Sequence, residues 1–159
     1  MKTFHAFTTA FILTALSLSI ISCTNNSTQA DLPDDPDVTT IEFDNMGATA
    51  YVVLSINGDG ASANLNEENA EISLRIGDRF RFNNTAGASN HPLDFRDSDR
   101  DKLLGQSNAD GQFDNDPDVD VETDGNIISF TLTESLAAEL NGYVCSFHPG
   151  MNGEISVNQ

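Results

Sequence analysis

Short runs in which apolar and polar residues alternate constrain this chain most, because they recur along most of its length. Alternation with period two places one face of a strand in a core and the other face in water. β-branched and aromatic residues, which favour strands, are concentrated in these runs, and turn-forming pairs such as Asn57-Gly58 separate them. We therefore predict an all-β sandwich of seven to eight strands, antiparallel or mixed. The segments that fit are 38–43, 49–56, 72–76, 79–82, 92–95, 126–132, 143–145 and 153–157.

Two parts of the chain depart from this pattern. Residues 133–140 have the pattern of one short helical turn, which Thr133 could cap at its start and Asn141-Gly142 could end. Residues 96–125 are irregular and rich in Asp. We predict that this second part is a long acidic surface segment with at most a short strand.

The N-terminus has the features of an export signal. Lys2 provides a positive charge, and the apolar run 11–21 is shorter than the roughly 20 residues that a membrane-spanning helix needs. The run ends in Ser22-Cys23, which resembles the lipobox of bacterial lipoproteins. That resemblance implies cleavage before Cys23, lipidation of Cys23 and a membrane anchor on the periplasmic or cell-surface side. An ordinary secretory signal with Cys23 near its cleavage site is the alternative.

The rest of the chain divides into a tether and a domain. Residues 23–37 are nearly free of apolar side chains and cannot bury enough surface to order themselves. Residues 38–159 have the size of one domain and are too few for two separate cores. The predicted organisation is a signal peptide over 1–22, a disordered tether over 23–37 and one β domain over 38–159.

The chain is strongly acidic, with 25 Asp and Glu residues against 7 Lys and Arg and a net charge of −18. Removal of residues 1–22 would take away Lys2 and no acid, so the exported protein would carry −19. Phosphate contacts need Lys and Arg, so nucleic acid is not an expected partner. We expect a soluble monomer whose self-repulsion is screened by salt, which favours a salty habitat and, less directly, a basic partner protein.

The cysteines are few. Cys23 and Cys145 are the two in the sequence, and lipidation of Cys23 would leave Cys145 without a partner for an internal disulfide. An unpaired thiol is unusual in an exported protein. Cys145 could form an intermolecular disulfide, remain as an inert buried thiol or bind a metal ion, and its neighbours in the sequence favour the metal.

These neighbours form a short motif on a predicted loop between two strands. Cys145, His148 and Met151 are spaced Cys-x-x-His-x-x-Met, which brings a thiolate, an imidazole and a thioether around one point. Two His, one Cys and a weak axial Met are the ligands of blue-copper electron-transfer sites. His91 is the one other His after residue 22. A single four-ligand site would therefore use both His residues and the free thiol of the exported chain.

Residues 143–157 resemble the C-terminal ligand loop of plastocyanin-like cupredoxins, in the short form seen in amicyanin. His91 follows the predicted strands over 72–82, as the first His ligand does in that family, and the resemblance covers roughly residues 70–157. It implies a Greek-key β-sandwich with one copper ion at one end. It also implies two equatorial imidazoles, an equatorial thiolate and an axial thioether, from His91, His148, Cys145 and Met151.

One position departs from the family. Many cupredoxins have Asn directly after the first His, where it hydrogen-bonds to the ligand thiolate and tunes the site. This chain has Pro92, which has no N–H and no polar side chain, so that donor to the sulfur is either missing or supplied from elsewhere, for example by Asn90 or Ser89. On the other side, Pro149 biases His148 to an extended backbone. We expect Phe147 to help keep the site dry.

The resemblance implies a carrier of single electrons between exported redox partners such as a cytochrome or an oxidase, with His148 as the electron exit. A protein that binds copper for storage, delivery or sensing would use the same ligands and is the main alternative. A metal-free interaction module that has kept the motif is a third possibility. An enzyme is not expected, because four protein ligands leave no open position on the metal for a substrate.

Other motifs are weaker. Residues 120–125 begin like an EF-hand calcium loop, but the twelfth position of that loop is Thr131 rather than Glu, and the pattern predicts no flanking helices. A solvated acidic face explains the segment better. The sequence shows no defensible Ser-His-Asp arrangement, glycine-rich phosphate loop or paired-carboxylate motif.

Overall fold

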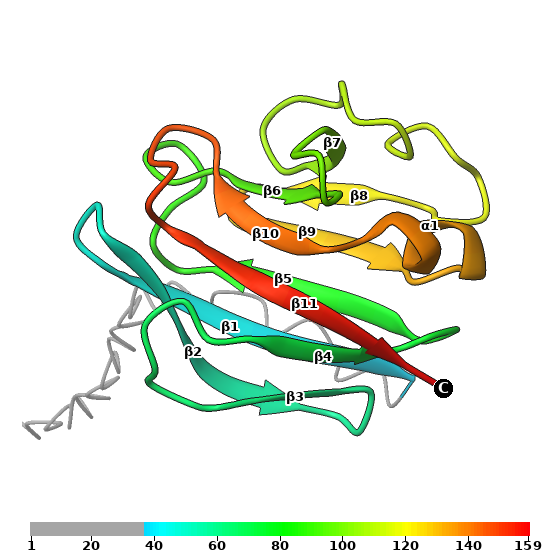
Figure 1. Ribbon diagram of the computed structural model, residues 1–159, viewed down its shortest axis with the longest axis horizontal. Coiled ribbons are helices and arrows are strands. Elements are labelled where there is room, and N and C mark those ends of the chain that lie inside the picture. The colour runs from blue at the N-terminus through cyan, green and yellow to red at the C-terminus, as the bar shows by residue number, and fades with distance from the viewer. Residues whose placement is uncertain (1–36) are drawn as a thin grey trace, which may run out of the picture. The chain divides into compact units, whose positions relative to one another are not determined.

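The computed structural model describes residues 37–159 (Figure 1). The predicted signal peptide, the Cys23 lipidation site and the predicted tether up to residue 36 lie outside the described residues. Within residues 37–159, no helix is long and apolar enough to cross a membrane.

The described chain forms two mixed β-sheets and one short helix (Figure 1). The first sheet has the strand order β2-β1-β5-β9-β8. Its strands are β1 (Val38–Met46), β2 (Ala50–Asn57), β5 (Arg79–Asn84), β8 (Glu122–Asp124) and β9 (Ile127–Thr131). The second sheet has the order β3-β4-β11-β10-β6-β7. Its strands are β3 (Ala61–Ala63), β4 (Ile72–Arg75), β6 (Leu93–Arg96), β7 (Lys102–Gly105), β10 (Gly142–Cys145) and β11 (Asn152–Asn158).

Each sheet contains one parallel pair, β1 with β5 and β4 with β11, and its other neighbours are antiparallel. The prediction of an all-β sandwich with mixed pairing is confirmed. The predicted number of seven to eight strands is wrong, because the described residues form eleven. The additional strands are β3, β7 and β8, which have only three or four residues each and are too short to show alternation.

The acidic segment 96–125 is also more ordered than predicted, since it contains both β7 and β8. Four of its apolar side chains are buried in the core, so the segment is more than a surface excursion. These side chains belong to Leu103, Leu104, Phe113 and Val119.

Aromatic side chains from the two sheets meet in the core. The ring centroids of Phe82 on β5 and Phe95 on β6 are 4.9 Å apart, and those of Phe43 on β1 and Tyr143 on β10 are 5.2 Å apart. All four side chains are buried, and both pairs are edge-to-face, an arrangement that stabilises the core beyond simple burial. This packing holds the ends of β5, β6 and β10, which carry the loops of the site.

The helix α1 (Glu134–Glu139) begins where the sequence predicts. The Thr133 side chain accepts a hydrogen bond from the backbone N–H of Leu136 at 3.2 Å, which is the geometry of an N-cap. Leu136 and Ala137 are its buried residues. In Figure 1 the helix lies near one end of the sandwich, directly before β10.

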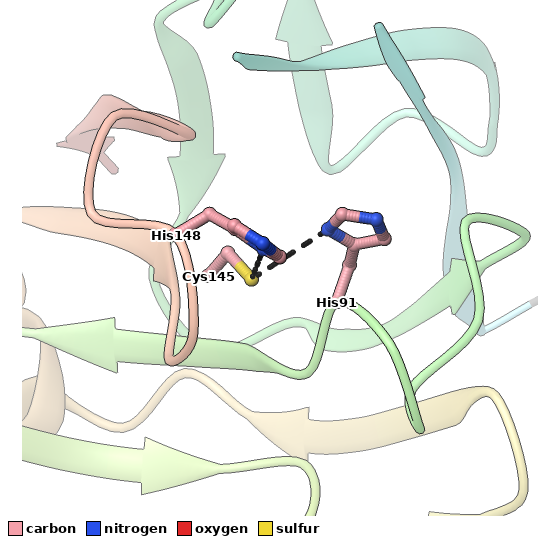
Figure 2. Close-up of side chains that lie close together, drawn as sticks. All are labelled: His91, Cys145 and His148. Atoms are coloured by element: carbon pink, nitrogen blue, oxygen red, sulfur yellow. Dashed lines mark hydrogen bonds between the residues drawn. The ribbon is translucent and has the colours of Figure 1, made fainter. Parts of the chain in front are cut away.

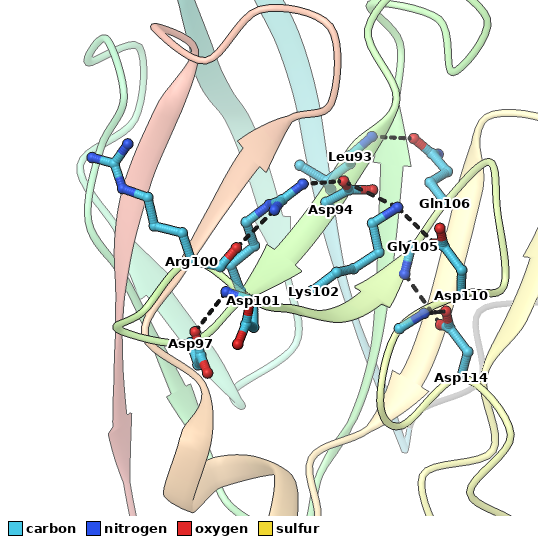
Figure 3. A network of polar contacts seen from close by, with 12 residues as sticks. Leu93, Asp94, Asp97, Arg100, Asp101, Lys102, Gly105, Gln106, Asp110 and Asp114 are labelled. Atoms are coloured by element: carbon cyan, nitrogen blue, oxygen red, sulfur yellow. Dashed lines mark hydrogen bonds and ion pairs between the residues drawn. The ribbon is translucent and has the colours of Figure 1, made fainter.

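A buried carboxylate joins β6 to β7 (Figure 3). Asp94 is 0% exposed, and its Oδ2 is 2.8 Å from a guanidinium nitrogen of Arg96 and 3.4 Å from Nζ of Lys102. Arg96 also donates to the backbone carbonyl of Arg100, and Lys102 also pairs with Asp110. Two of the chain's few basic residues are therefore committed to one buried acid.

Candidate metal centre

Three connections meet at the end of the sandwich opposite α1 (left in Figure 1). They are the β1–β2 turn, the β5–β6 loop and the β10–β11 loop over residues 146–151, which we call the ligand loop. Asn45 at the end of β1 approaches Nε2 of His91 to 3.4 Å, and the Ser146 N–H donates to the Pro92 carbonyl at 3.0 Å. Each connection is therefore joined to its neighbour by a polar contact.

His91, Cys145 and His148 lie together at this end (Figure 2). The Cys145 Sγ is 3.5 Å from Nδ1 of His148 and 3.9 Å from Nδ1 of His91. One ligand atom from each of the three residues lies within 4.8 Å of the others. The prediction that these residues come together is confirmed, and they are close enough to bind one metal ion.

Backbone hydrogen bonds close the ligand loop tightly. The Cys145 N–H donates to the Met151 carbonyl, and the Met151 N–H donates to the His148 carbonyl, each at 2.9 Å. These two hydrogen bonds connect Met151 to both other residues of the motif, and its side chain is completely buried. Its role as an axial ligand stays a prediction.

The three clustered side chains differ in exposure. Cys145 is 1% exposed, whereas His91 and His148 are partly exposed. Phe147 is 60% exposed, so the expectation that it shields the site is wrong. The chain leaves the strand geometry of β10 after Cys145, and the turn that follows directs the Phe147 side chain to solvent. Buried Tyr51 and Met151 enclose this end of the core instead.

The charge state of His91 suits a metal ligand. Burial lowers the pKa of the His91 ring, and the nearby His148 lowers it further. A neutral imidazole is the form that binds a metal, because a ring nitrogen must have a free lone pair. The His91 Nδ1 faces the thiol, and its Nε2 faces Asn45.

Sequence reasoning missed the polar side chains behind His91. The hydroxyl of Tyr51 and the Nδ2 amide of Asn84 both donate to the His91 carbonyl, each at 2.6 Å. Both side chains are fully buried. In the sequence, Tyr51 looks like an ordinary core aromatic residue of a strand. Asn84 looks like a polar residue at the end of a strand. In the described chain, no hydrogen bond joins the predicted donors Ser89 or Asn90 to the Cys145 sulfur.

Tyr51 also interacts with the thiol. Burial raises the pKa of the Tyr51 hydroxyl most, and the Cys145 side chain near it raises that pKa further. The hydroxyl therefore stays protonated at neutral pH and remains a donor.

Comparison with known proteins adds no relative, since no family model, curated protein or solved structure matches the chain. The site is therefore interpreted from its own donor atoms. One thiol and two imidazoles form a set with one soft and two borderline ligands, which fits late first-row metals and excludes calcium and magnesium.

Proposed function

We propose that the protein is a mononuclear type 1 copper protein that carries single electrons between exported redox partners. The observation that supports this most strongly is the buried Cys145 thiol with an imidazole nitrogen on each side, at 3.5 and 3.9 Å. A thiolate, two imidazoles and a weak axial thioether are the ligands of such sites. Bound there, copper would supply a one-electron couple between its Cu(II) and Cu(I) states.

The surrounding residues suit this role. The hydrogen bonds that close the ligand loop and the two that hold the His91 carbonyl would keep the donor atoms in one arrangement. Sulfur is shielded from water, while His148 is partly exposed and offers a contact point for a partner. This combination favours electron exchange at the protein surface rather than reaction of a substrate at the metal.

The proposal includes the fold and the location of the protein. A mixed β-sandwich in which β10 and β11 flank the ligand loop supports a cupredoxin-like Greek key, although the chain has more strands than expected. Export and lipid anchoring through Cys23 rest on the sequence of the N-terminal segment. The redox partner would be another exported protein, such as a cytochrome or an oxidase.

Copper loading tests the proposal directly. One equivalent of Cu(II) added to the purified protein should produce an intense blue or green thiolate-to-copper absorption band. Electron paramagnetic resonance of the same sample should show a narrow copper hyperfine splitting. A pale tetragonal Cu(II) signal or an absence of binding would contradict the type 1 site. Binding of Cu(I) alone, or rapid loss of copper to a chelator, would replace electron transfer with copper handling.

Met151→Leu tests the fourth ligand. Leu has a similar volume, so this core exchange should cost less than about 1.5 kcal/mol of stability. The absorption band should persist because Cys145 and both imidazoles remain. The reduction potential should rise, since loss of a thioether donor destabilises Cu(II) more than Cu(I), and it can be measured by redox titration. Leu74→Met, a buried exchange of the same kind on β4, should leave the potential unchanged. Equal potentials in all three proteins would remove Met151 from the ligand set.

A further inference from the structure

We infer that Tyr51 and Asn84 are positioning residues of the metal centre, which hold His91 from inside the sandwich through its backbone carbonyl. They would help to position this ligand at a point where Pro92 has no N–H and no polar side chain to contribute. This inference rests on the proposed function, because it concerns the same ligands, but part of its test needs no metal.

The backbone of His91 is held on both sides. Its carbonyl oxygen accepts one hydrogen bond from the Tyr51 hydroxyl and one from the Asn84 amide, both at 2.6 Å. A carbonyl oxygen has two lone pairs, so these two donors saturate it. On the other side, the His91 N–H donates to the Gly87 carbonyl at 2.8 Å. With both backbone groups occupied, the ring has a fixed point from which to approach the Cys145 sulfur.

Gln106 fixes the orientation of Asn84. The Gln106 Oε1 accepts from the second Asn84 amide hydrogen at 2.9 Å and from the Leu93 N–H at 3.0 Å, the second of which is drawn in Figure 3. Its Nε2 donates to the Asn126 carbonyl at 2.7 Å. Rotation of the Asn84 amide by 180° would place its oxygen against the His91 carbonyl and the Gln106 Oε1, so only one orientation is possible.

This orientation leaves one atom of Asn84 without a partner. The Asn84 Oδ1 is buried and accepts no hydrogen bond within the described part of the chain. A buried acceptor without a donor is unfavourable, and such groups are concentrated where a site requires a particular arrangement. The Asn84 amide is therefore oriented so that its nitrogen donates to the His91 carbonyl, and its oxygen is left without a hydrogen bond.

The Tyr51 hydroxyl has a single hydrogen, and it donates this hydrogen to the His91 carbonyl. The Cys145 side chain lies near this hydroxyl and adds to the rise of the hydroxyl pKa that burial causes. Ser89 and Asn90, the neighbours of His91 that could have served the sulfur, make no hydrogen bond to it among the described residues. Tyr51 is thus a buried neighbour of the thiol as well as a hydrogen-bond donor to the His91 backbone.

The chain offers a matched pair of tyrosines for the test. Tyr143 is buried in the same aromatic cluster, and its hydroxyl donates to a backbone carbonyl, that of Ala70, at 2.7 Å. Tyr51→Phe and Tyr143→Phe each remove one buried hydroxyl and one hydrogen bond to a carbonyl. We expect only the first removal to affect the metal centre, because only the Tyr51 hydroxyl donates to the His91 backbone. Stability measured by thermal unfolding should fall in both variants, which controls for a purely structural role.

Two readouts separate the variants. In the metal-free protein, the imidazole ¹⁵N and ¹H resonances of His91 should shift or broaden in Tyr51→Phe and stay as in the parent protein in Tyr143→Phe. In the copper-loaded protein, Tyr51→Phe should weaken copper binding roughly 10- to 100-fold, the usual effect of losing a group that orients a ligand, and should shift the thiolate band. Asn84→Ser should change the same signals.

The outcomes are distinguishable from those of the proposed function. Identical His91 resonances and copper affinities in the two Tyr variants would overturn the positioning role, even if the parent protein shows the expected blue band. A parent protein without that band would overturn the proposed function. In that case the His91 resonances of the metal-free variants would still decide whether Tyr51 positions the ring.

Discussion

Cys145→Ser should abolish the intense thiolate-to-copper absorption completely. A serine hydroxyl does not ionise near neutral pH and is a poor ligand for Cu(I), so the site would lose the donor that generates the band. Copper affinity should fall by more than the roughly 100-fold that follows from loss of an orienting contact. The measurement is a copper titration followed by visible absorption and competition with a chelator of known affinity.

The control for Cys145→Ser is a substitution at the next residue, Ser146→Ala. Cys145 is buried, so a hydroxyl there costs about 1–3 kcal/mol, and circular dichroism must show that the fold persists. Ser146→Ala removes a buried Oγ that has no hydrogen-bond partner in the described structure, and it should leave both band and fold unchanged. Retention of the band in Cys145→Ser would exclude the thiolate as a ligand and with it the type 1 assignment.

Arg96→Met should cause the largest loss of stability among changes to charged residues. It removes the closer of the two cations that neutralise Asp94, which is fully buried. Breaking a buried ion pair from one side costs about 3–5 kcal/mol, and we expect about 3 kcal/mol because Lys102 remains at 3.4 Å. Urea unfolding of the metal-free protein at neutral pH measures this difference.

An exposed ion pair provides the comparison. Arg75 pairs with Asp78 at 2.8 Å, but its side chain is 45% exposed, so Arg75→Met should cost at most about 1 kcal/mol. Adding Asp94→Leu to Arg96→Met should restore most of the lost stability, because the unpaired carboxylate is then gone. Equal effects of the two Arg variants would show that the Asp94 carboxylate does not depend on Arg96.

The clustering of His91, Cys145 and His148 could be predicted because these residue types are rare in the chain and two of them are closely spaced. Cys145 ends β10, His148 follows three residues later on the ligand loop, and His91 is the one other His after residue 22, so few alternative sites exist. The polar residues behind them could not be predicted in this way. Tyr51 and His91 are 40 residues apart, and alternation shows that Tyr51 faces inward without showing which backbone group lies opposite.

The errors have related causes. Phe147 follows a strand residue, but it lies in a turn where period-two reasoning no longer applies, and it faces solvent. The acidic content of residues 96–125 concealed two short strands and several core side chains. Charge describes the average polarity of a segment, whereas Leu103-Leu104 and Phe113 are enough to anchor it to the sandwich.

The parallel pairing of the last strand has a consequence for when the site can form. Ile155 of β11 pairs with Ile72 of β4, more than half the chain length earlier, and β11 also closes the ligand loop against β10. Pairings between such distant segments form slowly, because a long stretch of chain must first be ordered. The donor atoms therefore come together only when β11 pairs with β4 and β10, because this pairing closes the ligand loop. A metal ion that binds only when β11 is paired would stabilise this pairing and would slow unfolding that begins at β11.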